Sequence, residues 1–556
     1  MTFRFGSLRR PMIALLVVSI VTLQTLGQAT AAVVTTPKLA GIEAELAEKI
    51  TVASIKDMTA ALSAPDMEGR GTGQPGGDKA ANWIADRFKA FGLKPLGDKG
   101  SYLQKIEFKE TVLASDSAFA VGDQTLAYGT DFAFLPMNNG NKSISGDTVF
   151  ISYGIQSKPS NVDMLGGANL IGKVVVMLEG PPPGITKQDW EKQGFQSAVM
   201  QSVIFGGASA LVIIGLGNEE HPPEESISYN SRRQISLPNE KGWLAEVPPI
   251  VYVSSKGAEK LFASSGVTLK QALESAVTRE FKPIQLKQKA KIVAKYTTTK
   301  VIGNNVAGYL EGSDPKLKAE AVLFSAHYDA YGKENGKIYP GAADNALGTA
   351  ELLAVAEAYS RASQKPKRSM VFLAVTGEEY GLYGSKQWAK EPTWDIKKVA
   401  ANLNLDGIGS EVYGPVKTMV GYGAEHSSLG AELEAVAKLF DVNVIPDPMP
   451  DEKVFYRSDH YSFVERGVPS LMLLGAPAGA KEVWMKRIKD WEKTDYHQPG
   501  DVIQPTWVWE GPETVAEVMA ILGWRISETE AMPKWLATSR FAKLERGNTK
   551  EIPEEK

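Results

Sequence analysis

The sequence contains no cysteine among its 556 residues. This absence excludes disulfide bonds, catalysis by a thiolate, and metal sites built from cysteine, such as zinc fingers and iron–sulfur clusters. Histidine is also scarce, with five residues in the chain. Any metal site must therefore be built from histidine and carboxylate side chains.

The chain also lacks a large excess of charge of either sign. Its 61 Lys and Arg residues against 65 Asp and Glu residues give a formal net charge of −4. A protein that binds nucleic acid needs a basic surplus for the phosphates, so we expect no nucleic acid partner. With 43% hydrophobic residues, the composition excludes a disordered chain, and the length predicts more than one domain.

One apolar run, at the N-terminus, approaches the length of a membrane span. Arg9-Arg10 precedes an apolar stretch from Met12 to Leu26, and Ala29-Thr30-Ala31 follows it. This order predicts a signal peptide over residues 1–31 and export to the periplasm or the cell exterior. The alternative is a permanent membrane anchor, although polar residues interrupt the run. No later stretch reaches the roughly 18 apolar residues of a span, so we expect no stable membrane span after signal cleavage.

The hydrophobic pattern divides the rest of the chain into four regions. In residues 40–135, apolar side chains recur at helical spacing from Ala80 to Phe91. Residues 296–530 alternate apolar strands with loops and helices, which predicts an α/β domain with a mixed, mostly parallel sheet flanked by helices. Residues 531–556 form a charged tail whose end we expect to be frayed. Residues 136–295 are rich in turns and short β-type runs, which predicts a separate, mostly β module; the runs are Asp147–Ser152, Lys173–Leu178, Ala210–Ile214 and Ile250–Val253.

Ionisable residues follow three predicted strands of the α/β region. The strands Ala321–Ser325, Met370–Val375 and Ala401–Leu405 each end a few residues before such a group, and a fourth strand is expected at Ser470–Leu474. Sites in open α/β sheets form beyond the carboxyl ends of the strands, so these side chains should meet at one edge. They are His327, Asp329, Glu378, Glu379 and Asp406.

Two further residues complete a candidate metal site. Asp344 lies at or near the start of a predicted helix, and His497 follows later in the chain. With His327, Glu379 and Asp406 they supply two imidazoles and three carboxylates. This mixed donor set suits zinc or a similar transition metal. Catalytic zinc takes about three protein ligands, so five residues serve two ions if one carboxylate bridges. The set is His327, Asp344, Glu379, Asp406 and His497, with Glu378 left as a candidate base.

Five segments resemble the motifs of the M28 family of zinc metallopeptidases, and they occur in family order. They are Ser325–Asp329, Gly341–Gly348, Thr376–Ser385, Asn404–Asp406 and Tyr496–Asp501. The resemblance covers residues 45–135 and 295–530 and implies the zinc exopeptidase fold, a peptide substrate and two Zn²⁺ ions, with Co²⁺ or Mn²⁺ as alternative metals.

Carried over residue by residue, the resemblance assigns the ligands to two sites. Asp344 would bridge the ions, His327 and Asp406 would complete one site, and Glu379 and His497 would complete the other. A bridging carboxylate and water between two ions would lower the pKa of that water.

Other residues are assigned supporting roles. The resemblance makes Glu378 the general base, and the spacing of Asp329 from His327 allows its carboxylate to accept the other imidazole N–H and fix the tautomer. Ser458–Phe463 resembles the substrate-side segment of the family, so we expect Arg457 and Tyr461 to contact substrate; a salt bridge to a neighbour such as Asp459 is the alternative role of Arg457.

The β-rich region resembles a protease-associated (PA) domain, as inserted in several M28 members. The matching segments are Gly172–Val176, Gly206–Ile214 and Val247–Val253. The resemblance implies a module that shapes or covers the cleft and supplies no catalytic residue.

We therefore expect an exported dinuclear zinc exopeptidase, and among exopeptidases an aminopeptidase. A glutamate-type carboxypeptidase or dipeptidase stays open, because Arg457 could bind a C-terminal carboxylate. A glutaminyl cyclase-like acyltransferase would hold one zinc. A non-catalytic binding ectodomain is the remaining alternative, although every ligand position is filled. Nothing in the sequence predicts the oligomeric state.

Overall fold

The computed structural model describes residues 39–552, apart from residues 136–140, 158–161, 187–189, 191–193, 218–222, 240–247, 264, 278–280, 408–409, 478, 480 and 551. The predicted signal peptide, residues 1–31, lies outside the described residues.

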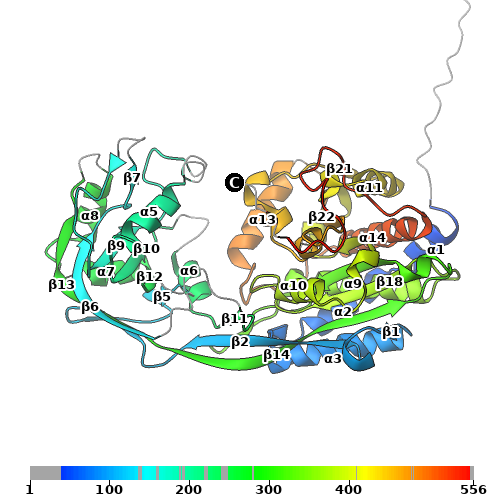
Figure 1. Cartoon of the computed structure of the whole chain (residues 1–556), viewed down its shortest axis with the longest axis horizontal. Coiled ribbons are helices and arrows are strands. Elements are labelled where there is room, and N and C mark those ends of the chain that lie inside the picture. Colours follow the sequence, from blue (N-terminus) through cyan, green and yellow to red (C-terminus); the bar gives the residue numbers. More distant parts are fainter. Residues whose placement is uncertain are drawn as a thin grey trace, which may run out of the picture. The chain divides into compact units, whose positions relative to one another are not determined.

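The described chain contains a ten-stranded sheet in the order β11-β2-β14-β18-β15-β19-β22-β20-β21, with β1 beside β14. Its long paired strands β2 and β14 run side by side in Figure 1. The four central strands β18, β15, β19 and β22 are parallel. Strand β14 pairs antiparallel with both β18 and β2, and β20 pairs antiparallel with β22 but parallel with β21. The predicted mixed sheet is therefore confirmed. Its strands are β1 (Lys94–Pro95), β2 (Leu103–Leu113), β11 (Gln234–Ser236), β14 (Tyr296–Leu310), β15 (Ala321–His327), β18 (Ser369–Val375), β19 (Val399–Asn404), β20 (Val416–Tyr422), β21 (Asn443–Ile445) and β22 (Ser470–Pro477).

Apolar side chains cover both faces of the central strands, which explains why these strands read as continuous hydrophobic runs. Along β15, Val322 and Phe324 point into the larger core, and Leu323 points into a smaller core on the opposite face. The larger core is covered by α1 (Gly41–Lys49), α2 (Val52–Leu62), α3 (Pro75–Ala90), α9 (Gly348–Ser360), α11 (Leu429–Ala437) and α14 (Glu510–Glu528).

The smaller core lies under α10 (Tyr383–Lys390) and α12 (His460–Val464), which contribute Trp388 and Phe463. Helix α13 (Lys481–Thr494) follows β22. The helix expected over Ala80–Phe91 is confirmed as part of α3, and it buries Ile84 and Phe88 against the larger core.

The first helices of the described chain pack against its last helix. Glu43 of α1 accepts two hydrogen bonds from Arg525 of α14, at 2.7 and 3.1 Å. The backbone N–H of Val52, at the start of α2, donates to Glu513 of α14 at 2.9 Å. These contacts join residues that are more than 450 positions apart in the sequence.

A second, eight-stranded sheet is built from the middle of the chain in the order β4-β3-β13-β6-β9-β10-β12-β5. It has its own hydrophobic core, and β6, β9, β10 and β12 confirm the four predicted runs. The strands are β3 (Ala118–Val121), β4 (Gln124–Leu126), β5 (Phe132–Phe134), β6 (Lys142–Phe150), β9 (Val174–Leu178), β10 (Ala210–Ile214), β12 (Ile250–Val253) and β13 (Ile284–Ala294), with helices α5 (Phe195–Ile204), α6 (Pro223–Asn230), α7 (Ser255–Phe262) and α8 (Leu269–Ala276).

The two sheets exchange strands across the boundary expected at residue 136. Strands β3 to β5 precede that boundary, yet they join the second sheet because β3 pairs with β13 and β5 pairs with β12. Conversely, β11 lies within the expected module but pairs with β2 of the ten-stranded sheet. The likeness of this region to a PA domain stays a prediction.

The described part of the expected charged tail packs against the rest of the fold, whereas residues 553–556, at the end expected to be frayed, lie outside the described residues. Phe541 is fully buried, and Arg546 donates hydrogen bonds of 2.7 Å to the carbonyls of Val399 and Ala400. Backbone acceptors at the start of β19 therefore hold this segment in place.

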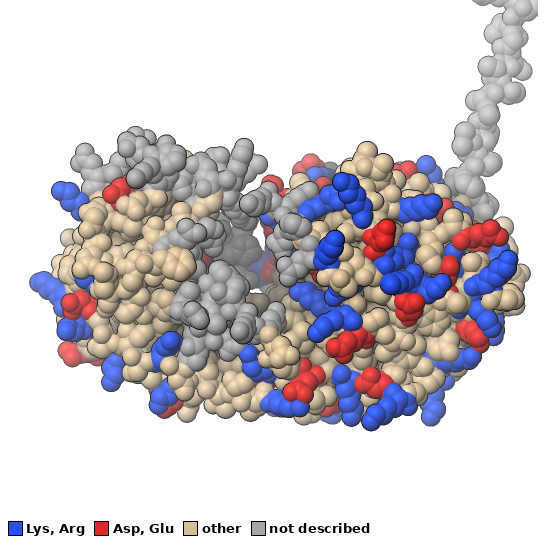
Figure 2. Space-filling model, in the orientation of Figure 1, with Lys and Arg blue, Asp and Glu red and all other residues tan. Residues whose placement is uncertain are grey.

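Basic and acidic side chains are interspersed over the face drawn in Figure 2. Several of them form exposed ion pairs, such as Lys486 with Asp490 at 2.6 Å. Among the helices of the described residues, none is both long enough and apolar enough to cross a membrane.

Candidate metal centre

The sheet brings the predicted residues to one edge. His327 is the last residue of β15, Glu378 and Glu379 follow β18, and Asp406 follows β19. Since β18, β15 and β19 are parallel neighbours, their carboxyl ends lie side by side, as expected for a site in an open α/β sheet. The two remaining residues come from the segment before α9, which carries Asp344, and the loop after α13.

Asp344 lies between the two histidines. Its Oδ1 atom is 3.2 Å from Nε2 of His327, and its Oδ2 atom is 3.2 Å from Nε2 of His497. One carboxylate therefore presents a different oxygen to each imidazole.

Two groups of potential ligands surround this carboxylate. In the first, Nε2 of His327 lies 3.2 Å from Asp406 Oδ1 and 3.9 Å from Glu378 Oε2. In the second, Nε2 of His497 lies 3.0 Å from Glu379 Oε2. The donor atoms within each group lie within 4.8 Å of one another.

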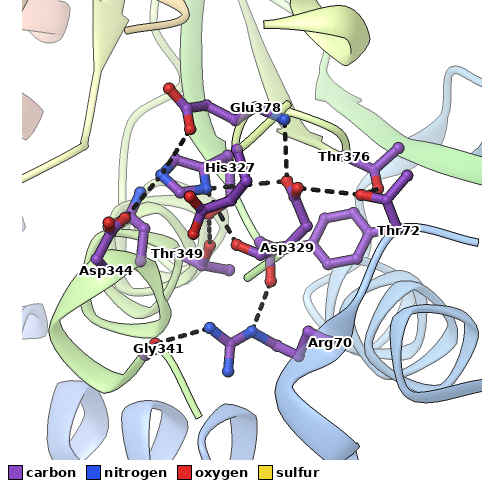
Figure 3. A network of polar contacts seen from close by, with 12 residues as sticks. Arg70, Thr72, His327, Asp329, Gly341, Asp344, Thr349, Thr376 and Glu378 are labelled. Carbon is purple, nitrogen blue, oxygen red and sulfur yellow. Dashed lines mark hydrogen bonds and ion pairs between the residues drawn. The ribbon is translucent and has the colours of Figure 1, made fainter. Parts of the chain in front are cut away.

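Asp329 supports His327 through a different atom from the one expected. The backbone carbonyl of Asp329 lies 3.1 Å from Nδ1 of His327, whereas its carboxylate is 3.8 Å away. The carboxylate instead accepts hydrogen bonds from the Thr72 hydroxyl at 3.0 Å and from the Glu378 N–H at 3.3 Å (Figure 3). Asp329 therefore orients both the imidazole and the segment that carries the candidate base.

Three supporting residues have no sequence signal strong enough to reveal their roles. Buried Asp501 accepts hydrogen bonds from the backbone N–H groups of Ala343 at 2.8 Å and Asp344 at 3.0 Å. Ser458 donates to Asp406. Arg70 is fully buried and donates to the carbonyls of Tyr328, Pro340 and Gly341, so it joins the loop after β15 to the Asp344 segment (Figure 3). Asp501 and Ser458 each belonged to a segment quoted for the family resemblance, but neither was given a role there, and Arg70 belonged to none.

Two glycines allow the backbone to approach the site closely. Gly341 has φ +56, and a Cβ atom there would lie 2.3 Å from the carbonyl of Asp344. At Gly348, a Cβ atom would lie 2.4 Å from the carbonyl of Leu405. Side chains at these positions would therefore displace the segments carrying Asp344 and Asp406.

Burial and neighbouring charges shift the acid–base properties of the site. Burial raises the pKa of Glu378 well above its usual value; the His327 imidazole opposes this shift, and Asp406 adds to it. Burial acts in the same direction on Asp344, but hydrogen bonds from His327 and His497 outweigh it and hold the pKa of Asp344 below its usual value. Glu378 thus holds a proton more readily than Asp344, which stays ionised.

The donor set fits metal ions. The carboxylates of Asp344, Glu378, Glu379 and Asp406 are largely buried, and no Lys or Arg of the described residues forms an ion pair with them. Buried carboxylates without a cationic partner are costly. A mixture of imidazole nitrogens and carboxylate oxygens suits zinc and similar ions.

Comparison with known proteins finds a family model that matches the part of the chain carrying this centre. Residues 305–522 match the model of peptidase family M28. This chain carries a peptidase family M28 domain. The M28 domain includes all six of the charged residues at the centre, from His327 to His497.

Solved structures resemble the whole fold beyond the M28 domain. The aminopeptidase from Aneurinibacillus sp. strain AM-1 has a TM-score of 0.57 and 18% sequence identity, covering 88% of this chain and 97% of that chain. A zinc aminopeptidase from Bacillus subtilis has a TM-score of 0.54 and 17% identity, covering 89% and 98%. At these identities the likeness establishes the fold.

Curated relatives align with smaller parts of the chain. A vacuolar membrane protease of Clavispora lusitaniae is 37% identical over 107 residues, which are 19% of this chain and 10% of that protein. A glutamate carboxypeptidase 2 homolog of Caenorhabditis elegans is 26% identical over 329 residues, covering 52% of this chain and 40% of that protein. The predicted periplasmic or extracellular location is wrong by this comparison, because relatives in several yeasts are named for a vacuolar membrane.

A pocket in the M28 domain opens beside the centre. Arg457 lines it, and its contact with substrate stays a prediction. Its guanidinium lies 4.0 Å from the carboxylate of Glu452, so Glu452, and not Asp459, is its acidic neighbour. Tyr461 instead packs in an aromatic cluster, with ring centroids 5.7 Å from Phe455 and 5.0 Å from Tyr456, because it lies on the buried side of α12. His460, left out of the ligand set, is also buried and faces Phe455.

Proposed function

We propose that this protein is a metal-dependent aminopeptidase that holds two Zn²⁺ ions. His327 and Asp406 would bind one ion, Glu379 and His497 the other, and Asp344 both. The observation that supports this assignment best is the position of Asp344, whose two oxygens each lie 3.2 Å from a different histidine. A carboxylate that bridges two ions must present one oxygen to each ion.

Bound ions would polarise the substrate carbonyl and lower the pKa of a water molecule. Glu378 would take a proton from the attacking water and return it to the leaving amine. Burial raises its pKa, which makes the carboxylate a better acceptor for a proton from the attacking water. The hydrogen bond from its N–H to Asp329 keeps it beside His327.

The pocket supports a substrate with a free amino end. Glu452 and Glu492 line the pocket together with Met449, Val454 and Trp491. Carboxylates attract an α-ammonium group, and apolar side chains accept an apolar residue. The pocket therefore suits the amino-terminal residue of a peptide better than an acidic residue at the carboxyl end.

The experiment that tests this function compares three versions of one peptide library: with both ends free, with acetylated amino ends, and with amidated carboxyl ends. We expect acetylation to abolish cleavage and amidation to leave it unchanged, with single amino-terminal residues as the products identified by mass spectrometry. Loss of carboxyl-terminal residues from the acetylated library would contradict an aminopeptidase.

A glutamate-type carboxypeptidase is the second candidate. Arg457 lines the same pocket and could bind a C-terminal carboxylate, and the relative from Caenorhabditis elegans is named a glutamate carboxypeptidase 2 homolog. For this activity, amidation and not acetylation would block cleavage, and Arg457→Met would raise KM more than it lowers kcat.

A further inference from the structure

Arg232 joins the middle region of the chain to the metal centre. It lies in the short loop between α6 and β11 and is only 4% exposed. Its Nη2 atom donates a hydrogen bond of 2.7 Å to the backbone carbonyl of His497. A residue far from the M28 motifs in sequence therefore contacts a candidate ligand directly.

The same guanidinium packs on tyrosine rings that surround the imidazole. Its central carbon lies 4.3 Å from the ring centroid of Tyr331 and 4.4 Å from that of Tyr339. Tyr331 in turn contacts His497, with ring centroids 4.8 Å apart and its hydroxyl 3.4 Å from Nδ1. Arg232 thus supports His497 both at its carbonyl and, through Tyr331, at its ring.

His497 needs such support because of its backbone. Its φ is 55°, a left-handed conformation that is unfavourable for a non-glycine residue and persists where surrounding contacts impose it. It lies in the loop after α13 and outside any strand. The Arg232 hydrogen bond, from the loop between α6 and β11, holds its carbonyl. The ring of the adjacent Tyr496 stacks on its imidazole, at 3.7 Å between centroids.

Docking of the middle region does not by itself explain a buried Arg232. The next residue, Arg233, forms the ion pairs of this contact, with Glu334 at 2.7 Å and Glu110 at 3.0 Å. Within the described residues, Nε and Nη1 of Arg232 have no hydrogen-bond partner. A buried guanidinium is expensive, and the polar contact that Arg232 makes is with the carbonyl of His497.

We propose that Arg232 is a positioning residue that sets the affinity of the metal site formed by Asp344, Glu379 and His497. This inference rests on the proposed two-ion function. Residues that orient metal ligands contribute about 10- to 100-fold to metal affinity. Arg232 therefore makes one of the two sites depend on the middle region of the chain.

The test is a Zn²⁺ titration of metal-free protein against a competing chromophoric chelator. We expect Arg232→Met to lower the affinity for one of the two ions by about 10- to 100-fold and to leave the affinity for the other unchanged. Arg232→Lys, which keeps the charge and one donor, should recover part of the loss. In a His497→Ala background, Arg232→Met should cause no additional loss, because the ligand it positions is already gone.

Arg233→Met is the matched control, since it removes the ion pairs of the same contact and leaves the bond to His497. It should not lower the affinity for the ion whose binding Arg232→Met weakens. Equal loss in both variants would mean that docking alone matters and would overturn the inference, as would unchanged binding of both ions in folded Arg232→Met, with circular dichroism reporting folding. If the unsubstituted protein binds fewer than two ions, the proposed function fails before the role of Arg232 is tested.

Discussion

At the scale of single residues, the centre assigns different tasks to two adjacent, identical side chains. Glu378 lies on the His327 side, with its N–H bonded to Asp329, and Glu379 lies 3.0 Å from His497. Consecutive side chains diverge from the backbone, so one can bind an ion while the other exchanges protons.

Replacement by glutamine should separate these tasks. Glu378→Gln keeps the shape of the side chain but accepts no proton, so kcat should fall by about 10²- to 10⁴-fold while both ions stay bound and KM changes little. Glu379→Gln should lose the ion shared with His497 or bind it more weakly, and added Zn²⁺ should restore part of the activity. Steady-state kinetics and elemental analysis of both variants measure these effects. An ion lost from Glu378→Gln but kept by Glu379→Gln would show that the two roles are exchanged.

At the scale of secondary-structure elements, the metal centre depends on how closely α9 approaches the end of β19. Gly348, at the first position of α9, allows this approach. Two effects of a methyl group there oppose each other. Helix propensity would favour alanine by about 1 kcal/mol, whereas overpacking costs about 1–3 kcal/mol.

We expect overpacking to dominate at Gly348, because the clash is with backbone and with the Asn345 side chain at 2.3 Å. Gly348→Ala should therefore lower the urea midpoint of unfolding and weaken Zn²⁺ binding. Glu357→Ala on the same helix is the control: it removes an ion pair with a largely exposed Arg361 and should change stability by less than about 0.5 kcal/mol. A higher midpoint for Gly348→Ala would show that the backbone yields easily at this position.

The elements that could be predicted are those with a strong local pattern. Strands β15, β18 and β19 are buried on both faces and read as continuous apolar runs. Helix α3 has one apolar face and shows helical spacing of its apolar residues. The positions of His327, Glu379 and Asp406 follow from these strands because their carboxyl ends must meet, whereas Asp344 and His497 lie in segments outside them. By contrast, β11 has three residues, and its pairing with β2 depends on a contact between distant segments. Arg232 and Arg70 escaped prediction for the same reason, since they act by donating to carbonyls remote in sequence.

At the scale of the whole molecule, bound metal should contribute to stability as well as activity. Ligands that bind only the folded chain stabilise it by about 2.7 kcal/mol at a free concentration 100 times Kd. Removal of metal with a strong chelator should therefore abolish peptide hydrolysis and lower Tm, and Zn²⁺ should restore both. Calorimetry and elemental analysis before and after chelation check this prediction, with two ions expected per active chain. A single ion in fully active protein would contradict the dinuclear centre and favour the cyclase alternative.

The contacts of α1 and α2 with α14 have a consequence for biosynthesis. Glu43 and Val52 emerge from the ribosome early, but their partners Arg525 and Glu513 are translated near the end. Until then, Leu46 and Ile55, which are fully buried in the finished protein, have no complete core to enter. Contacts so distant in sequence slow folding and leave apolar surface exposed in the nascent chain. The larger core must therefore close after translation is nearly complete, and the growing chain is a natural client for chaperones that shield apolar helices.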